Sequence, residues 1–291
     1  MSFAAEVDQK GNVMKDLVQN QLDKYGAKTE QDEENALKEI TQEIGLYGLA
    51  KSGFFEHALF QGGTCLRIVH QLDRFSEDLD FSLRHPGKFN LAPFLEKTAT
   101  FMKAYGFEME VSGEEKADKS VQTQFLKDDS IKHIVSLKHL RDYRKKINFK
   151  VELDTNPPSH AVEEMKFVEF PTDFSILCHN VPTLMSGKIH ALLCRKYVKG
   201  RDWYDFNWYI SQKAKPNYAF LKASLHQTGP WQGQELQINE AWLRKALTKK
   251  IESLDWRKIV TDVTPFLRDE KVTEVENLWS KDFFLMKTSK L

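Results

Sequence analysis

The sequence has few of the features that mark disulfide-bonded or zinc-binding proteins. Its 291 residues include only three cysteines, Cys65, Cys178 and Cys194, and none of them has C-x-x-C spacing. An odd number of scattered cysteines argues against a disulfide framework and against a structural zinc site. We therefore expect all three to be small core residues.

The chain also lacks a long apolar segment. No stretch approaches the roughly 20 apolar residues that a membrane-spanning helix needs. Residues 1–8, MSFAAEVD, lack the basic and apolar regions of a signal peptide. These absences predict a cytoplasmic protein that does not associate with membranes.

A net charge is missing as well. Lys plus Arg and Asp plus Glu number 42 each, so any binding to nucleic acid must use a local patch. One candidate is residues 138–146, in which Tyr143 lies among cations, and a second is Lys245, Lys249 and Lys250. Cations hold phosphates and a tyrosine can stack on a base. A charge run is also common in a solvated turn, so both interpretations stay open.

The most informative segment is residues 60–83, FQGGTCLRIVHQLDRFSEDLDFSL. Gly62 and Gly63 allow a tight backbone turn. The apolar spacing that follows predicts a short helix with its amino end at Thr64. Free N–H groups and the helix dipole favour bound phosphate at such an end.

The same segment ends in two alternating carboxylates. If residues 78–83 are extended, Asp78 and Asp80 point to one side and the apolar residues to the other. An Asp-x-Asp pair alone is common on solvated strand faces. Next to a phosphate-binding turn, however, two carboxylates can hold Mg²⁺ ions that bridge the phosphates of a nucleotide. The order of elements therefore predicts a metal-dependent nucleotidyl-transfer site.

This segment resembles the AbiEii/AbiGii-type toxin nucleotidyltransferases, within the polymerase-beta-like nucleotidyltransferase superfamily. The superfamily pattern is Gly-Gly/Ser, a spacer and Asp-x-Asp/Glu, and the toxin family adds Arg-x-Ser-x-Asp-x-Asp-Phe. The residues that match are Gly62, Gly63 and Thr64, followed by Arg74, Ser76, Asp78, Asp80 and Phe81. The resemblance implies that the two aspartates are catalytic metal ligands. It implies nucleotide binding by Gly62, Gly63, Thr64, Arg74 and Ser76.

Residues 149–154, FKVELD, are similar to the second strand of the family. Alternation places Lys150, Glu152 and Asp154 on the side opposite the apolar residues. The motif assigns the third catalytic, metal-binding carboxylate to Glu152 and nucleotide binding to Lys150. Asp154 is the alternative acid, at the strand end. A Lys–Glu pair on a half-buried strand is the structural alternative.

Residues 187–206 are similar to the family's helical Lys-(x)6-Arg segment. On one helix Lys188 and Arg195 share a face, so both could reach a triphosphate. The resemblance makes Lys188 catalytic and Arg195 nucleotide-binding. We expect Gly200 to end this helix.

The Arg-Asp-x-Tyr-Asp part of the motif should open the next helix. The resemblance makes Asp202 catalytic, either by orienting Lys188 or as a base, and the sequence does not separate its role from that of Asp205. A structural alternative pairs Arg201 with Asp205 at i,i+4 and leaves Asp202 as a partner of the helix dipole.

The patterns together predict an α+β fold, with a nucleotidyltransferase-type mixed sheet flanked by helices and a helical carboxy-terminal lobe. The expected domains are a core over residues 1–186 and a helical domain over 187–291. The expected elements are helices over 13–60, 91–105, 242–254 and 256–263, strands at 107–111, 134–137, 149–154 and 174–178, and a charged loop at 113–120.

The resemblance implies transfer of a nucleoside monophosphate from an NTP to an acceptor, with pyrophosphate leaving and Mg²⁺ or Mn²⁺ as cofactor. Members of the family are toxins of bacterial toxin–antitoxin and abortive-infection systems, which implies a cognate antitoxin protein. Some members modify tRNA ends, which implies an RNA acceptor. A small-molecule acceptor and a non-catalytic nucleotide-binding module are the alternatives.

Overall fold

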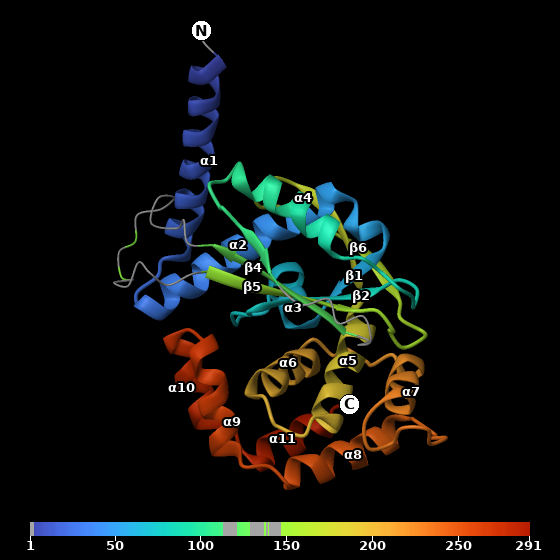
Figure 1. Ribbon diagram of the computed structural model, residues 1–291. Helices are drawn as coiled ribbons and strands as arrows, with labels where there is room; N and C mark the ends of the chain where they lie inside the picture. Colours follow the sequence, from blue (N-terminus) through green and yellow to red (C-terminus); the bar gives the residue numbers. More distant parts are fainter. Residues whose placement is uncertain (1–2, 113–120, 129–136, 138, 140–146) are drawn as a thin grey trace. The chain divides into compact units, whose positions relative to one another are not determined.

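The computed structural model describes residues 3–112, 121–128, 137, 139 and 147–291 (Figure 1). The chain divides into two compact units. The first comprises Met1–Phe60, Phe75–Pro157 and Met165–Leu177, and the second Gln61–Arg74, Pro158–Glu164 and Cys178–Leu291. The expected loop at 113–120, most of the expected strand at 134–137 and most of the basic patch at 138–146 lie outside the described residues.

The first unit is built around a mixed β-sheet. Within the described part of the chain it has seven strands in the order β3-β4-β5-β2-β1-β7-β6. Strand β2 runs parallel to β5, whereas β4 runs antiparallel to both β3 and β5. The predicted α+β fold with a mixed sheet is confirmed. The strands are β1 (Ala58–Gln61), β2 (Asp78–Leu83), β3 (Glu110–Ser112), β4 (Val121–Asp128), β5 (Ile147–Asp154), β6 (Glu163–Val168) and β7 (Phe174–His179).

Helices α2 and α4 lie side by side against this sheet (Figure 1). Helix α2 begins at a capping box formed by Thr29 and Asp32 and ends at Gly53, whose φ of 84° suits glycine. A Cβ at Gly48 would lie 2.8 Å from Cγ2 of Thr98, so glycine allows the two helices to approach closely. The helices of the first unit are α1 (Phe3–Tyr25), α2 (Glu30–Ser52), η1 (Phe54–Glu56) and α4 (Ala92–Lys103).

The apolar faces of β2 and β5 form part of the core. Leu79, Phe81, Val151 and Leu153 are each at most 1% exposed. The Phe81 ring packs edge-on against Phe54, with centroids 5.0 Å apart. Because side chains alternate along a strand, burial of these residues turns the intervening acids to the opposite face.

The second unit is largely helical, as predicted for the carboxy-terminal lobe. Its aromatic core includes Trp256 stacked on Phe284 at 4.3 Å, with Trp203 edge-on to both. Its helices are α3 (Gly62–His70), α5 (Val181–Cys194), α6 (Gly200–Ser211), α7 (Tyr218–Gln227), α8 (Glu240–Glu252), α9 (Trp256–Val263), η3 (Thr264–Phe266), α10 (Asp269–Leu278) and α11 (Lys281–Thr288).

The role predicted for Gly200 is wrong. Helix α5 ends at Cys194, and Gly200 begins α6. A Cβ at Gly200 would lie 2.3 Å from the carbonyl oxygen of Ile259, so this glycine permits close packing of α6 on α9. Helix α3 likewise begins at Gly62, before the expected Thr64.

Three strands, β1, β4 and β6, were not predicted. All three cysteines are free thiols, but only Cys65 and Cys178 are buried, and Cys194 is half-buried. No described helix is long and apolar enough to cross a membrane. The division of the chain at residue 187 stays a prediction.

Candidate functional site

Four charged side chains share one face of strands β2 and β5. In the parallel register Asp78 is aligned with Lys150, and Asp80 with Glu152. Aligned residues of neighbouring strands project to the same side, and all four are partly exposed. The predicted alternation is confirmed, and the structure brings together the two expected carboxylates, the expected third acid and the expected lysine.

The electrostatics of this face favour a cation. Lys150 and Glu152 form an ion pair. Burial opposes the charge of Lys150, but the hydrogen bond and charge of Glu152, together with Asp78 and Asp80, outweigh burial and raise the pKa of the ammonium group. The carboxylates therefore create a negative local field that already stabilises one positive charge.

The alternative acid, Asp154, has a local structural role. Its Oδ1 accepts a hydrogen bond from the backbone N–H of Asn156 at 2.9 Å, which turns the chain after β5. Burial raises the pKa of Asp154, although the Asn156 N–H opposes this shift. These contacts favour Glu152 over Asp154 as the functional acid.

The donor set suits a hard divalent cation. Carboxylate oxygens are the ligands that Mg²⁺ prefers, and Asp78 and Asp80 supply them from one strand face. Among the described residues no three His, Cys, Asp or Glu side chains are grouped as a metal cluster. The Glu152 carboxylate is paired with Lys150 instead of joining such a cluster.

The segment before β2 is tied to helix α2. The side-chain Nε2 of Gln42 donates to the carbonyl oxygens of Ser76, at 3.2 Å, and Glu77, at 2.6 Å. Gln42 is itself buried. This places the backbone of Ser76, an expected nucleotide-binding residue, at the entry to the strand that carries the two aspartates.

The glycine turn in the second unit opens helix α3. Gly62 has φ of 78°, a conformation that favours glycine. The N-cap residue, Gln61, makes no side-chain capping hydrogen bond, and the first turn carries no acidic residue. Such an amino end suits phosphate. Thr64 is fully buried, so Gly62 and Gly63 form the partly exposed surface of this turn.

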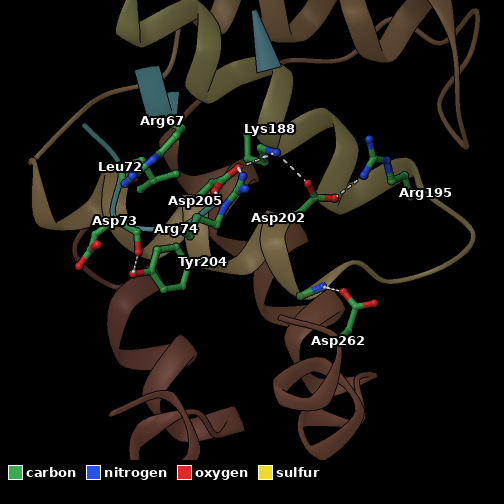
Figure 2. A network of polar contacts seen from close by, with 11 residues as sticks. Arg67, Leu72, Asp73, Arg74, Lys188, Arg195, Asp202, Tyr204, Asp205 and Asp262 are labelled. Atoms are coloured by element: carbon green, nitrogen blue, oxygen red, sulfur yellow. Dashed lines mark hydrogen bonds and ion pairs between the residues drawn. The ribbon is translucent and has the colours of Figure 1, made fainter. Parts of the chain in front are cut away.

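A buried chain of charges lies deeper in the second unit (Figure 2). Arg74 donates to both carboxylate oxygens of Asp205, at 2.6 and 2.8 Å. The two side chains are 2% and 0% exposed. The Nζ of Lys188 lies 2.8 Å from Asp205 Oδ2 and 2.7 Å from Asp202 Oδ1. An Nη of Arg195 reaches Asp202 Oδ2 at 2.6 Å. Helices α5 and α6 and the segment before β2 thus meet in one ion network.

The network fixes the charge states of its members. Burial would lower the pKa of Lys188, but Asp202 and Asp205 outweigh burial and raise it. Burial would raise the pKa of Asp202, but Lys188 and Arg195 outweigh it and lower the pKa. Asp202 is therefore ionised at neutral pH and a weak proton acceptor, which favours the orienting role over the role of a base.

Further contacts hold Arg74 in place. The Arg67 guanidinium donates to the carbonyl oxygen of Leu72 at 2.9 Å, and the Tyr204 hydroxyl donates to that of Asp73 at 2.8 Å (Figure 2). Gln71 adopts a left-handed conformation with φ of 55° at the end of α3. The backbone is thus fixed on both sides of the turn that leads to Arg74.

The network differs from the alternative drawn from the sequence. Asp205 pairs with Arg74 and Lys188, whereas the Arg201 guanidinium lies 3.9 Å from the centroid of the Phe266 ring. The partners of Asp205 are thus Arg74 and Lys188, which the structural alternative did not include. The sequence analysis left the role of Asp205 open, and the structure makes this carboxylate the partner of both Arg74 and Lys188. Its position one turn after Asp202 was the available signal.

The sequence matches the family described as "Nucleotidyl transferase AbiEii toxin, Type IV TA system" over residues 45–286. The chain belongs to this family. The resemblance inferred from the glycine turn and the aspartates is confirmed. The protein is thus an AbiEii-type nucleotidyltransferase of a type IV toxin–antitoxin system, for which the family implies an NTP substrate and an antitoxin partner. Nucleotidyltransferases of this kind typically use a divalent metal.

No curated protein matches the chain. Among solved structures, MenT4, a nucleotidyltransferase toxin from Mycobacterium tuberculosis H37Rv, is 17% identical with a TM-score of 0.52, covering 90% of this chain and 97% of its own. JHP933 from Helicobacter pylori is 16% identical with a TM-score of 0.49, covering 84% of this chain and 88% of its own. The similarity to MenT4 shows a shared fold.

Proposed function

We propose that this AbiEii-type toxin transfers a nucleoside monophosphate from an NTP to an RNA acceptor, with pyrophosphate as the leaving group. One observation carries the proposal: Asp78 and Asp80 lie on one face of β2, in register with Lys150 and Glu152 on β5. Carboxylates on neighbouring strands can hold the metal ions used in phosphoryl transfer, and a lysine beside them can stabilise the charge of the phosphates.

Each residue of this face has a proposed task. Asp78 and Asp80 would hold Mg²⁺ or Mn²⁺, and Glu152, which is paired with Lys150, is the third acid that the family motif assigns to this face. A metal ion bound there would supply positive charge to the triphosphate and to the attacking oxygen. Lys150, whose ammonium is kept charged by the surrounding carboxylates, neutralises phosphate charge.

The second unit contributes phosphate binding and positive potential. The amino end of α3 at Gly62 binds phosphate through backbone N–H groups. The ion network pairs three cations, Arg74, Lys188 and Arg195, with two carboxylates, which leaves one positive charge. We assign Asp202 the orientation of Lys188. The family motif contains both the residues of this ion network and those of the carboxylate face, so we assign both groups to one reaction.

The acceptor is proposed from the family, some members of which modify tRNA ends, and the reaction would take place in the cytoplasm. The test incubates the full chain with total bacterial tRNA, each α-labelled NTP in turn, and Mg²⁺, Mn²⁺ or a chelator. We expect label on tRNA with at least one NTP, and none with the chelator.

The variants separate catalysis from folding. Asp80→Asn should abolish labelling, because it removes a proposed metal ligand. Asp154→Asn is the matched control, because its side chain lies on the same face but serves the turn at Asn156. Pyrophosphate release without labelled RNA would refute the RNA acceptor and favour a small molecule. Neither label nor pyrophosphate with any NTP would refute the proposal as a whole.

A further inference from the structure

The segment between α5 and α6 carries cations and an exposed aromatic side chain. Residues 195–199 have the sequence RKYVK. Lys196 is exposed, and Tyr197 is 63% exposed. The Nζ of Lys199 lies 5.8 Å from the centroid of the Tyr197 ring, within the range of a cation–π contact. An accessible aromatic ring among cations is the combination with which proteins hold single-stranded nucleic acid.

Both ends of this segment are held in place within the second unit. At its start, Arg195 pairs with Asp202 at 2.6 Å (Figure 2). At its end, the backbone N–H of Gly200 donates to Oδ2 of Asp262, also at 2.6 Å. A segment that is already ordered loses less conformational freedom when it binds a partner.

Helix α8 adds further cations to this surface. The Nζ of Lys250 lies 3.5 Å from the carbonyl oxygen of Arg195, which brings the last turn of α8 to the start of the segment. Lys245 and Lys249 are exposed one turn apart on the same helix. These three lysines are the second basic cluster predicted from the sequence. The structure thus joins that cluster to the segment that presents Tyr197.

Neighbouring acids do not cancel the positive charge of this surface. The Asp202 carboxylate is shared by Lys188 and Arg195, so its charge is already balanced. Within the described part of the chain, neither Lys196 nor Lys250 forms an ion pair with a carboxylate. Clustered cations of this kind attract the phosphates of a nucleic acid.

We propose that Lys196, Tyr197, Lys199, Lys249 and Lys250 form a surface that binds a single-stranded part of the RNA acceptor. This assignment rests on the RNA acceptor proposed above. The lysines contact phosphates, and the tyrosine ring stacks on one base. A single strand fits better than a duplex, because an unpaired base exposes its face to an aromatic ring. With so few cations, we expect a dissociation constant on the order of 10 µM near physiological salt.

The test is fluorescence anisotropy of a labelled single-stranded RNA of about 12 nucleotides. The full chain is titrated without NTP, from about 50 to about 200 mM salt, so that binding is measured apart from catalysis. The double variant Lys196→Ala, Lys250→Ala should bind about tenfold or more weakly at the lowest salt. It should also lower the slope of log affinity against log salt by about 1.4, since each phosphate contact on a single strand contributes about 0.7.

The tyrosine has a different expected signature. Tyr197→Ala should weaken binding by about tenfold and leave the salt slope unchanged, because stacking on a base releases no counterions. Tyr197→Phe keeps the ring and should bind like the intact chain. Lys213→Ala is the control for a lost surface charge, because Lys213 is exposed and lies beyond the other end of α6, about 18 Å along the helix from Gly200. It should change neither affinity nor slope, and thermal melting should show that all variants fold.

Three results would overturn the proposal: no RNA binding by the intact chain, RNA binding that neither the lysine pair nor Tyr197→Ala weakens, and equal binding of a polyglutamate chain of the same charge. The labelling of tRNA tells this proposal apart from the proposed reaction. Label on tRNA together with RNA binding that the variants do not change refutes this surface alone. Binding that the variants weaken, without label or pyrophosphate from any NTP, refutes the reaction alone.

Discussion

Replacing Asp205 with alanine should destabilise the second unit more than any surface change. The Asp205 side chain is fully buried, accepts both hydrogen bonds of the Arg74 fork and lies 2.8 Å from Lys188 Nζ. Removing one member of a buried ion pair costs about 3–5 kcal/mol, because the remaining charge stays in a poorly solvated site. In this variant Lys188 still forms its ion pair with Asp202, whereas Arg74 loses its bidentate partner. We therefore expect the free energy of unfolding to fall by about 4 kcal/mol. That is a large part of the roughly 5–15 kcal/mol that stabilises a typical domain.

Urea unfolding followed by tryptophan fluorescence measures this loss. With a slope of about 2 kcal/mol per molar urea, the midpoint should fall by roughly 2 M. The control is Glu240→Ala, which removes an exposed i,i+4 pair with Arg244 and should cost at most about 0.5 kcal/mol.

A double variant tests the cause. Combining Arg74→Met with Asp205→Leu removes the stranded charge and fills the space with apolar atoms, so it should be more stable than Asp205→Ala. If Asp205→Ala costs no more than Glu240→Ala, the buried network does not hold the second unit together and the reasoning fails.

Three further changes have definite expectations. Gly200→Ala places a Cβ 2.3 Å from the Ile259 carbonyl oxygen and should cost about 2 kcal/mol in thermal unfolding; an unchanged melting temperature would contradict the close packing of α6 and α9. Gly62→Ala forces a φ of 78° on alanine and should cost about 1 kcal/mol in urea unfolding, whereas equal stability would mean that the turn relaxes. Burial lowers the pKa of His179 from 6.5 to about 4. As the pH falls, this imidazole therefore gains a proton in the unfolded chain before it does so in the folded protein. This group should therefore lower the free energy of unfolding by about 3 kcal/mol between pH 7 and pH 4. His179→Phe should remove that part of the pH dependence. Identical pH profiles of stability for the two proteins would refute this prediction.

The strands that carry the acids were predictable because one face of each is buried. Leu79 and Phe81 on β2, and Val151 and Leu153 on β5, alternate with the polar residues in the sequence as they do in the sheet. Strand β6 lacks such a signal. It lies at the sheet edge and buries only Val168, so the alternation of Met165 and Phe167 with Lys166 does not mark a face packed on the core.

The ion network could be predicted only in part. Lys188, Arg195 and Asp202 are close in sequence, and their motif predicted that they act together. Arg74 and Asp205 are 131 positions apart, and tertiary packing brings them together. Sequence reasoning favours local partners, which is why it paired Asp205 with Arg201.

The most direct test of the carboxylate face is pyrophosphate release from an NTP, measured for the intact chain, Asp80→Asn and Asp154→Asn with a divalent metal and total tRNA. The account predicts release by the intact chain and by Asp154→Asn, and a loss of at least about 100-fold for Asp80→Asn, as expected when a group that stabilises the transition state is removed. Equal release by Asp80→Asn and the intact chain would contradict the assignment of this face to catalysis.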